Sequence, residues 1–425
     1  MAIYRHRQTP ARANQATPQP ALNLGRRHRP DYWLLTLTAT LLVFGLVVVY
    51  SISPGLAASQ KVSQNYFIFK QLIDIGLAAG AFMVAASLPI AKWRRLATPL
   101  LALAAIGSIV VMFTPLNEIY QAHRWIRLGS YSLQVVELIK LALIIWLAKF
   151  LAGQVSAGRF SDWRRCWQPL LAISLIVGFV VAKLQSDLGS AAVIFAIIVL
   201  MIYSLGLSLK KMLLALSIVA LLVTGAVATS DYRRQRFWAF WHPEANCQTT
   251  SYHACQALIS VGSGGLFGLG LGYSVQAFGY LPEASNDSIF AIIAEKFGFI
   301  GTSMLIMFYG LFIWRLQRLA RLSTDLFSRL IVIGVLAWLS TQMIINVGSM
   351  LGLLPLKGIT LPLISQGGTS IIFLTAALGL VFQISRYTKY NVSSQNQSDS
   401  SAYYSHGRRR LRRPPYTAAS LSRRA

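Results

Sequence analysis

The run WLLTLTATLLVFGLVVVYSI, residues 33–52, contains twenty residues and no charged side chain. Twenty residues of α-helix rise about 30 Å, the thickness of the hydrocarbon core of a bilayer. The run therefore predicts a transmembrane helix. A charged break, KLQSD at 183–187, separates the fifth and sixth apolar runs and predicts that they form an interrupted hairpin. The nine apolar runs that follow the first are 68–89, 96–114, 133–151, 168–183, 188–206, 211–230, 287–314, 328–350 and 368–386.

The composition of the 425-residue chain agrees with this pattern. Hydrophobic residues make up 55% and charged residues only 12%, and the mean hydropathy is +0.54. Soluble domains carry about 25% charged residues. These values exclude a soluble globular enzyme and a disordered protein. We therefore predict an all-α integral membrane protein of about ten transmembrane helices, with its membrane domain at 33–386.

The distribution of positive charge predicts the orientation. The net charge is +26, and 28 of the 39 basic residues fall in the two tails and in the gaps on one predicted side. The positive-inside rule assigns that side, and both termini, to the cytoplasm. Because topology explains the basic excess, we expect no nucleic-acid partner. The basic tails, 1–32 and 387–425, are predicted to be disordered.

The longest predicted loop, 231–286, joins the seventh and eighth helices on the extracytoplasmic side. Loops of this length are usually functional. It contains Cys247 and Cys255, which we expect to pair on that side, the alternative being two free thiols. Cys166 lies in a cytoplasmic gap and is expected to stay reduced. The glycine-rich stretch 262–272 is expected to lie outside the membrane.

Charged residues mark the fourth predicted helix: Arg124 precedes it, and Glu137 and Lys140 lie inside it. An ionisable side chain at membrane depth is costly and by default indicates a functional site. A spacing of three puts Glu137 and Lys140 on one face, where they can neutralise each other. One hypothesis is a pair that only holds the helix in register. The other is a site for an anionic head group, with Arg124 as the phosphate-binding fork.

Two aspartates lie at the starts of predicted helices. Asp187 belongs to the break in the hairpin, and its structural alternative is a solvated turn residue. Asp287 lies in the first turn of the eighth helix, where Ser285 or Asn286 could serve as the N-cap. The structural alternative for Asp287 is a side chain that only complements the helix dipole.

Polar residues and glycines also fall in or beside other predicted helices. Glu295 and Lys296 lie two turns below Asp287 and could pair with other intramembrane charges. Asp74 is expected to make an interhelical polar contact. Gly367 and Gly368 precede the last helix and allow close approach of the backbone.

Several sequence signatures are absent. The chain has no phosphate-binding G-x-x-x-x-G-K-[ST] motif, no His/Cys cluster with zinc spacing and no G-x-S-x-G elbow. The sequence implies no cofactor or metal ligand set, and it leaves a divalent cation open. Chemistry at the outer leaflet must therefore use carboxylates and cations.

The chain resembles the SEDS family (shape, elongation, division and sporulation) of polytopic peptidoglycan glycosyltransferases. The resemblance extends over about 33–386, and Ala284 points to the division branch of the family. Ser285, Asn286, Ser288 and Gln366 depart from the family motifs, which have His, Thr, Phe and Tyr there. Four stretches carry the likeness: RWIRLG and QVVELIK within 124–140, QSDLGS at 185–190, GSGGLFGLGLG at 262–272 with LPEASNDSIFAIIAE at 281–295, and LPLISQGGTS at 361–370.

The resemblance implies that lipid II is polymerised into glycan strands at the outer face of the cytoplasmic membrane, at the division septum. Asp287 would be the general base, in an inverting displacement of undecaprenyl pyrophosphate. Substrate-binding residues carried over from the motifs are Arg124, Glu137, Lys140, Asp187, Gly367 and Gly368. Implied partners are a class B penicillin-binding transpeptidase and other membrane proteins of the divisome.

Two alternatives stay open at this point. A transporter that moves lipid II across the membrane without bond formation would also need buried charge and broken helices. It would, however, need polar groups along the whole crossing, whereas catalysis needs a carboxylate near the outer surface. A non-catalytic scaffold of the divisome would tolerate neutralisation of the motif charges.

Overall fold

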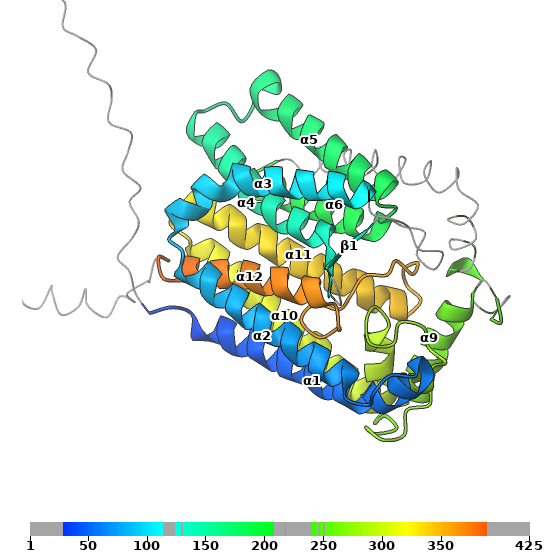
Figure 1. Cartoon of the computed structure of the whole chain (residues 1–425). Coiled ribbons are helices and arrows are strands. Elements are labelled where there is room, and N and C mark those ends of the chain that lie inside the picture. Colours follow the sequence, from blue (N-terminus) through cyan, green and yellow to red (C-terminus); the bar gives the residue numbers. More distant parts are fainter. Residues whose placement is uncertain are drawn as a thin grey trace, which may run out of the picture. The chain divides into compact units, whose positions relative to one another are not determined.

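The computed structural model describes residues 29–113, 124–128, 131–207 and 251–388, together with 217, 234, 238, 240–242, 244 and 247–249. These residues form a helical bundle (Figure 1). Its α-helices are α1 (Tyr32–Gln60), α2 (Tyr66–Ser87), α3 (Ile90–Met112), α4 (Val135–Ser156), α5 (Gln168–Phe179), α6 (Leu188–Tyr203), α9 (Tyr252–Ser263), α10 (Ile289–Leu322), α11 (Leu326–Met350) and α12 (Gly368–Ser385). Short π-helical turns, η1 (Trp163–Trp167) and η2 (Val180–Leu184), flank α5, and a 3₁₀ turn, η3 (Gln276–Phe278), precedes α10.

Nine of the ten predicted spans coincide with described helices. The seventh, 211–230, lies outside the described residues except for Ser217, and so do 1–28 and 389–425 of the two tails. Within the described part, seven helical segments are long and apolar enough to cross a membrane: α1, α2, α3, the Trp163–Leu184 segment, α10, α11 and α12. The chain is therefore a multi-pass, all-α membrane protein. The total of ten helices and the orientation stay predictions.

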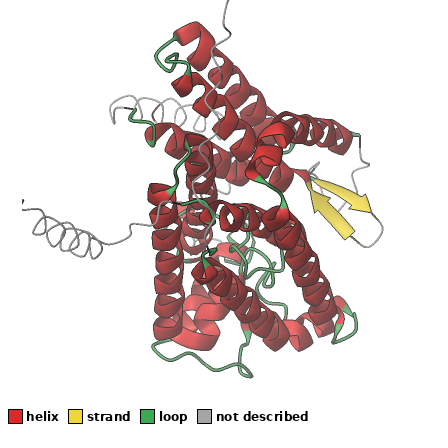
Figure 2. Ribbon diagram, turned by 90° about the vertical axis from the view of Figure 1, so that its left-hand side faces the viewer, coloured by secondary structure: helices red, strands yellow, loops and turns green. Residues whose placement is uncertain are grey.

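A small β-hairpin was not predicted. Strands β1 (Trp125–Leu128) and β2 (Tyr131–Gln134) pair antiparallel, with Trp125 opposite Gln134. The fourth helix therefore begins at Val135, not at 133. Figure 2 shows the two strands at the edge of the helices. Aromatic and aliphatic residues in both segments suit a pleated strand, and the hairpin carries Arg124 at its start.

Glycines allow the closest helix packing. α12 packs along α2, where a Cβ at Gly379 would lie 2.5 Å from the carbonyl oxygen of Phe82. α11 packs against α4 and α6, and a Cβ at Gly334 would lie 2.7 Å from Ile144. Trp338 of α11 is completely buried between these elements. α11 and α12 thus form the interior of the bundle, while α5 buries only Leu170.

α10 is broken at Gly298, and the glycine-rich stretch fills the break. Gly298 has φ +64°, and a Cβ there would lie 2.4 Å from the amide nitrogen of Gly268. The carbonyls of Glu295 and Lys296 accept hydrogen bonds from the stretch, and the N–H groups of Phe299 and Ile300 donate to it. The stretch 262–272 therefore packs into the helical bundle at this break, and its position outside the membrane stays a prediction. Broken helices are tolerated where protein satisfies the freed backbone groups.

Glu295 and Lys296 form no ion pair with an oppositely charged residue of another element within the described part of the chain, although sequence analysis raised that pairing. Glu295 accepts hydrogen bonds from Ser274 and from the backbone N–H groups at 275 (2.9 Å) and 276 (3.2 Å). Lys296 donates to the carbonyl of Leu271 at 2.6 Å. Both side chains are buried; Lys296 holds the glycine-rich stretch at Leu271, and Glu295 holds the segment 274–276 that follows it. Their charges are satisfied largely by polar groups of a loop.

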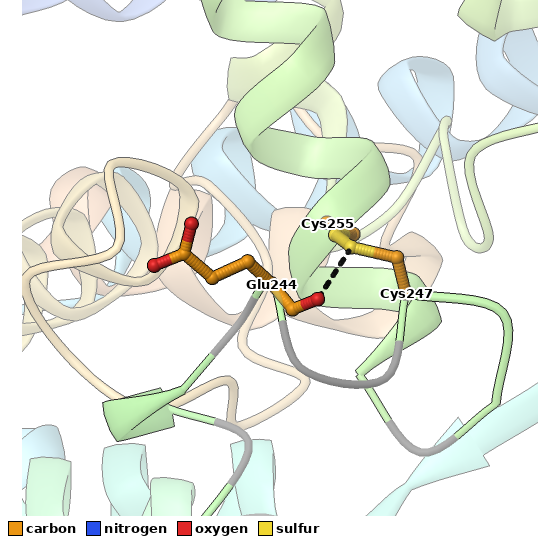
Figure 3. Close-up of a disulfide and its surroundings, with 3 residues drawn as sticks. All are labelled: Glu244, Cys247 and Cys255. Atoms are coloured by element: carbon orange, nitrogen blue, oxygen red, sulfur yellow. Dashed lines mark hydrogen bonds between the residues drawn. A yellow bond between two sulfur atoms is a disulfide. The ribbon is translucent and has the colours of Figure 1, made fainter.

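The described part of the long loop 231–286 contains α9 and η3. The predicted disulfide between Cys247 and Cys255 is present, and it attaches the start of α9 to the preceding turn (Figure 3). The Cys247 sulfur lies 3.8 Å from the carbonyl oxygen of Glu244. Cys166 is buried and free, as expected.

Candidate functional site

A cavity of about 210 Å³ lies at the end of the bundle where α6 and α10 begin. Three predicted site residues from distant parts of the sequence line it: Arg124, Asp187 and Asp287. The other lining residues are Ser186, Leu188, Gly189, His253, Glu283, Leu356, Lys357 and Gly358. The hairpin, the break before α6, α9, the turn before α10 and the loop after α11 therefore converge on one hollow.

Asp287 lies in the turn that leads into α10. Ser288 is the N-cap, rather than Ser285 or Asn286 as expected, because Glu283 adopts φ +52° and the turn closes later. Asn346 of α11 donates to the backbone carbonyl of Asp287 at 2.7 Å. The carboxylate faces the opposite wall, since a Cβ at Gly358 would lie 3.5 Å from Asp287 Oδ2.

Arg124 joins the hairpin to the break before α6. Its guanidinium donates to the carbonyl oxygens of Gln185 at 3.0 Å and Ser186 at 2.6 Å. A guanidinium has five N–H groups, so three remain beyond these two bonds. Arg124 is half-buried on the cavity wall. It is therefore held rigidly and can still bind an anion.

Asp187 is the N-cap of α6 and is buried, so it is not a solvated turn residue. It accepts hydrogen bonds from the backbone N–H of Ser190 at 3.0 Å and from the Ser190 hydroxyl at 2.9 Å. These bonds fix its orientation on the cavity wall. Its acceptor capacity is partly used by its own helix, as is usual for a capping carboxylate.

Sequence reasoning missed three residues of the cavity: Lys357, His253 and Glu283. Lys357 lies in the loop between α11 and α12 and has no motif spacing of its own. His253 lies on α9, far from the other wall residues in sequence. A general signal was available for Lys357 and His253, because each is an ionisable residue in a gap between predicted helices that sequence analysis assigns to the extracytoplasmic side.

Glu137 and Lys140 form the predicted pair, but they do not line the cavity. Lys140 Nζ lies 2.7 Å from Glu137 Oε1, and the two residues are 1% and 3% exposed. Lys140 also donates to Gln342 Oε1 at 3.3 Å and lies 5.0 Å from the centroid of the Trp338 ring. All three directions around the ammonium group are thus occupied by the interior of the bundle.

Gln342 connects this pair to the loop that precedes α12. Its side-chain nitrogen donates to the carbonyl of Thr360 at 3.0 Å and lies 3.3 Å from the Ser370 hydroxyl. Sequence reasoning missed this residue. Its signal is a polar ridge within an apolar helix: Trp338, Gln342, Asn346 and Ser349 recur at spacings of four, four and three, which is one helical face.

Gly367 and Gly368 also lie away from the cavity. A Cβ at Gly367 would lie 2.9 Å from Thr360, and one at Gly368 would lie 3.3 Å from both carboxylate oxygens of Asp74. The buried Asp74 of α2 thus faces the N-terminus of α12, where a negative charge is favourable. The two glycines permit this close packing of α12 against α2 and its neighbouring loop, and the polar interhelical contact of Asp74 stays a prediction.

Buried charge is concentrated at the end of the bundle that holds the cavity. Of the seven charged residues that are buried in the described part, six lie there: Asp74, Glu137, Lys140, Asp187, Glu295 and Lys296. The seventh, Asp31, caps α1 at the opposite end and pairs with Arg315 at 2.6 Å. The described helices therefore carry no buried charge along the remainder of the crossing.

The cavity wall combines the two kinds of group that sequence analysis called for. Arg124 and Lys357 supply positive charge, which can bind an anion. Asp187, Glu283 and Asp287 supply carboxylates, which can accept a proton. Within the described residues, no three His, Cys, Asp or Glu side chains are grouped as metal ligands. The arrangement suits proton abstraction beside an anionic leaving group.

Comparisons with known proteins agree with this geometry. The profile of the FtsW/RodA/SpoVE family, described as cell cycle proteins, matches residues 32–390. Stage V sporulation protein E of Bacillus subtilis is 33% identical over 368 residues, which cover 86% of this chain and 99% of that protein. A probable peptidoglycan glycosyltransferase FtsW of Thioalkalivibrio sulfidiphilus is 35% identical over 366 residues, covering 85% and 90%. A chain in a solved peptidoglycan synthase complex matches with a TM-score of 0.69 at 27% identity, covering 85% and 99%.

Proposed function

The chain belongs to the FtsW/RodA/SpoVE family of cell cycle proteins, and from this we propose that it is a peptidoglycan glycosyltransferase. Its substrate is lipid II, a disaccharide-pentapeptide on undecaprenyl pyrophosphate, which it polymerises into glycan strands. A relative that it matches over 85% of its length is named as a probable enzyme of this kind. The cavity at one end of the bundle is the proposed site of the reaction.

The observation that carries this proposal is the convergence of Arg124, Asp187 and Asp287 on one cavity. They come from segments more than fifty residues apart, and Lys357 joins them from a fourth. Packing alone gives no reason to gather two cations and three carboxylates around a hollow. A reaction that removes a proton and releases a diphosphate needs both kinds of group close together.

The reaction assigns a role to each side of the cavity. The Asp287 carboxylate accepts the proton of the acceptor sugar hydroxyl, whose oxygen forms a new bond to the anomeric carbon of the donor. The bond from that carbon to the pyrophosphate oxygen breaks, and the pyrophosphate leaves with the electron pair. Arg124 and Lys357 stabilise its charge. A single base and a direct displacement invert the anomeric configuration.

Glu137, Lys140, Gly367 and Gly368 support the site from the interior in this proposal. The Lys140 ammonium is committed to Glu137, Gln342 and the Trp338 ring. Gln342 in turn holds the loop at Thr360, a few residues beyond Lys357. The pair and the glycines therefore position the loop between α11 and α12, and Asp187 fixes the facing wall through the cap of α6.

The location of the buried charges argues against transport of lipid II as the function. A transporter would need charged or strongly polar groups along the path through the membrane. The buried charges of the described helices lie at the cavity end, with only Asp31 at the other. A site for chemistry near one surface accounts for this distribution better than a path across the bilayer.

Family membership supports a further proposal on the location and the partners of the enzyme. We place the protein in the cytoplasmic membrane at the division septum, with the cavity on the outer side. The matched chain in the solved structure belongs to a peptidoglycan synthase complex that coordinates polymerization and crosslinking. This supports a partnership with a class B penicillin-binding transpeptidase and, through it, with other divisome proteins.

Reconstitution of the purified protein with lipid II, with and without the transpeptidase, tests the proposal. Glycan strands on a denaturing gel are the expected product. Fluorescent lipid II in the same vesicles, followed by a quencher added outside, reports movement across the bilayer. Movement without any polymer under either condition would favour the transporter and contradict the proposal.

A further inference from the structure

His253 of α9 lies on the cavity wall beside Asp287 and has no role in the proposed reaction. Its ring atom Nε2 lies 2.7 Å from the hydroxyl oxygen of Ser288, the residue that follows Asp287. The imidazole is half-buried. A residue of the long extracytoplasmic loop therefore contacts the turn that carries the proposed base.

The direction of this hydrogen bond follows from the second bond of Ser288. The Ser288 hydroxyl donates to the carbonyl oxygen of Pro282 at 2.8 Å. A hydroxyl has one hydrogen, so the oxygen of Ser288 can only accept from His253. His253 Nε2 therefore carries a proton and acts as the donor.

The turn around Asp287 is held on two sides as a result. From α11, Asn346 donates to the carbonyl of Asp287 at 2.7 Å. From α9, His253 donates to the side chain of Ser288 at 2.7 Å. The backbone N–H of Ser288 also donates to the carbonyl of Glu283 at 3.2 Å, which closes the turn. Asp287 lies between these attachments.

α9 is itself fixed, so it can serve as a support. Near the C-terminal end of α9, the Ser260 hydroxyl donates to the carbonyl of Ala291 in α10 at 3.0 Å. The disulfide between Cys247 and Cys255 attaches its first turn to the preceding segment (Figure 3). His253 lies within the eight-residue interval that this disulfide closes. The imidazole is therefore presented from a tethered helix start.

We infer that His253 is a positioning residue: it acts through Ser288 to hold Asp287 in the direction needed for proton abstraction. This inference rests on the proposed function of Asp287 as the base. It requires a hydrogen-bond donor at the position of Nε2, and it does not require the imidazole to exchange a proton. The two requirements can be separated by substitution.

Three variants separate them in a polymerisation assay with purified lipid II. His253→Phe keeps the ring shape and removes the donor, and kcat should fall by about ten- to a hundredfold, as for a small displacement of a reacting group. KM should change little. His253→Gln restores a donor at nearly the same reach and should recover most of the loss. His242→Phe is the matched control, because that exposed imidazole packs at a tilt against Trp238 and does not line the cavity.

Ser288→Ala, alone and combined with His253→Phe, tests the route of the effect. If His253 acts through Ser288, the double variant loses no more activity than the more severe single variant. Thermal unfolding of each variant separates a loss of positioning from a loss of folding. If the loss of folded protein in His253→Phe accounts for its whole loss of activity, His253 is merely a structural residue and the inference is overturned.

Two other results would overturn it as well. Wild-type kcat for His253→Phe would show that the contact does nothing for Asp287, and failure of His253→Gln to recover activity would show that the imidazole itself is required. Asp287→Asn, run in parallel, distinguishes the two levels of the account. If Asp287→Asn polymerises lipid II at the wild-type rate, the proposed base is refuted, whatever the His253 variants do.

Discussion

Removing one partner of the Glu137–Lys140 pair should destabilise the protein far more than removing both. The two charges lie 2.7 Å apart in a site where each residue is at most 3% exposed. The second carboxylate oxygen of Glu137 is buried and has no hydrogen-bond partner among the described residues. Lys140→Met therefore leaves a buried carboxylate that water does not solvate and that no other cation in the described part neutralises.

The size of the effect distinguishes a charge pair from an ordinary hydrogen bond. Stranding a buried charge costs about 3–5 kcal/mol. Losing one hydrogen bond inside a membrane protein costs about 0.6 kcal/mol on average. Glu137→Gln with Lys140→Met leaves no charge, only an amide whose unmet hydrogen bonds cost about 1–3 kcal/mol. The double variant should thus be more stable than either single variant.

Unfolding in mixed detergent micelles measures these free energies, with glycan synthesis measured on the same samples. Lys149→Met is the matched control, because Lys149 belongs to the same helix, is partly exposed and lies 3.3 Å from Thr98. Its substitution should cost less than about 1 kcal/mol. Because Lys140 does not line the cavity, the double variant should also regain most of the polymerising activity that the single variants lose.

Two outcomes would refute this reasoning in different ways. Single variants that each cost about 0.6 kcal/mol and add in the double variant would show that the charges are not desolvated. A double variant that is stable yet inactive would show that Lys140 reaches the substrate, as the family motif implied, and that the bundle rearranges around it when lipid II binds.

Three further predictions concern the fold and its orientation. Gly298→Ala should destabilise the protein by about 1–3 kcal/mol or more, because its φ of +64° is strained for alanine and a Cβ would meet the neighbouring backbone. In the same unfolding assay Gly310→Ala should be harmless, because a Cβ there meets nothing within 4 Å. Cys255→Ser should lower the unfolding free energy by about 2–3 kcal/mol, the closure entropy of an eight-residue loop, and a reductant should do the same to the wild type while leaving the variant unchanged. In intact cells, a cysteine introduced at Ser63 between α1 and α2 should react with an impermeant thiol reagent, and one introduced at Ser420 in the C-terminal tail should be protected from it. The reverse pattern would invert the orientation.

Sequence reasoning identified the helices because their signal is local. Each apolar run is long enough to cross a bilayer, and such a run has few alternatives. The β-hairpin at 125–134 was missed because its local signal is too short. Its strands are four residues each and directly precede an apolar helix, so their alternation is too short to separate from that helix.

The cavity illustrates what sequence could and could not provide. Arg124, Asp187 and Asp287 were candidates because they belong to motifs and lie at membrane depth or at helix starts. Only the family resemblance implied that they belong to one site, because their meeting depends on the packing of α6, α10 and the hairpin. Lys357 and His253 reach the cavity only through tertiary structure.

Two buried charges are satisfied by nonlocal partners. Sequence analysis considered opposite charges as partners for Glu295 and Lys296. Instead Leu271, the penultimate residue of the glycine-rich stretch, accepts from Lys296, and the segment 274–276 that follows the stretch donates to Glu295. The departure of Ser288 from the family motif also becomes intelligible in the fold. Its hydroxyl accepts a hydrogen bond from His253, which a phenylalanine at that position could not do.

The central claim is that Asp287 is the base that activates the acceptor hydroxyl. Its most direct test is the rate of glycan formation from purified lipid II by Asp287→Asn, which keeps the shape of the side chain and removes the proton acceptor. Asp325→Asn, the same change at the N-cap of α11 at the opposite end of the bundle, is the control. We predict a fall of about 10²–10⁴-fold for Asp287→Asn with unchanged thermal stability, and near wild-type activity for the control. Glycan strands formed by Asp287→Asn at the wild-type rate would contradict the account.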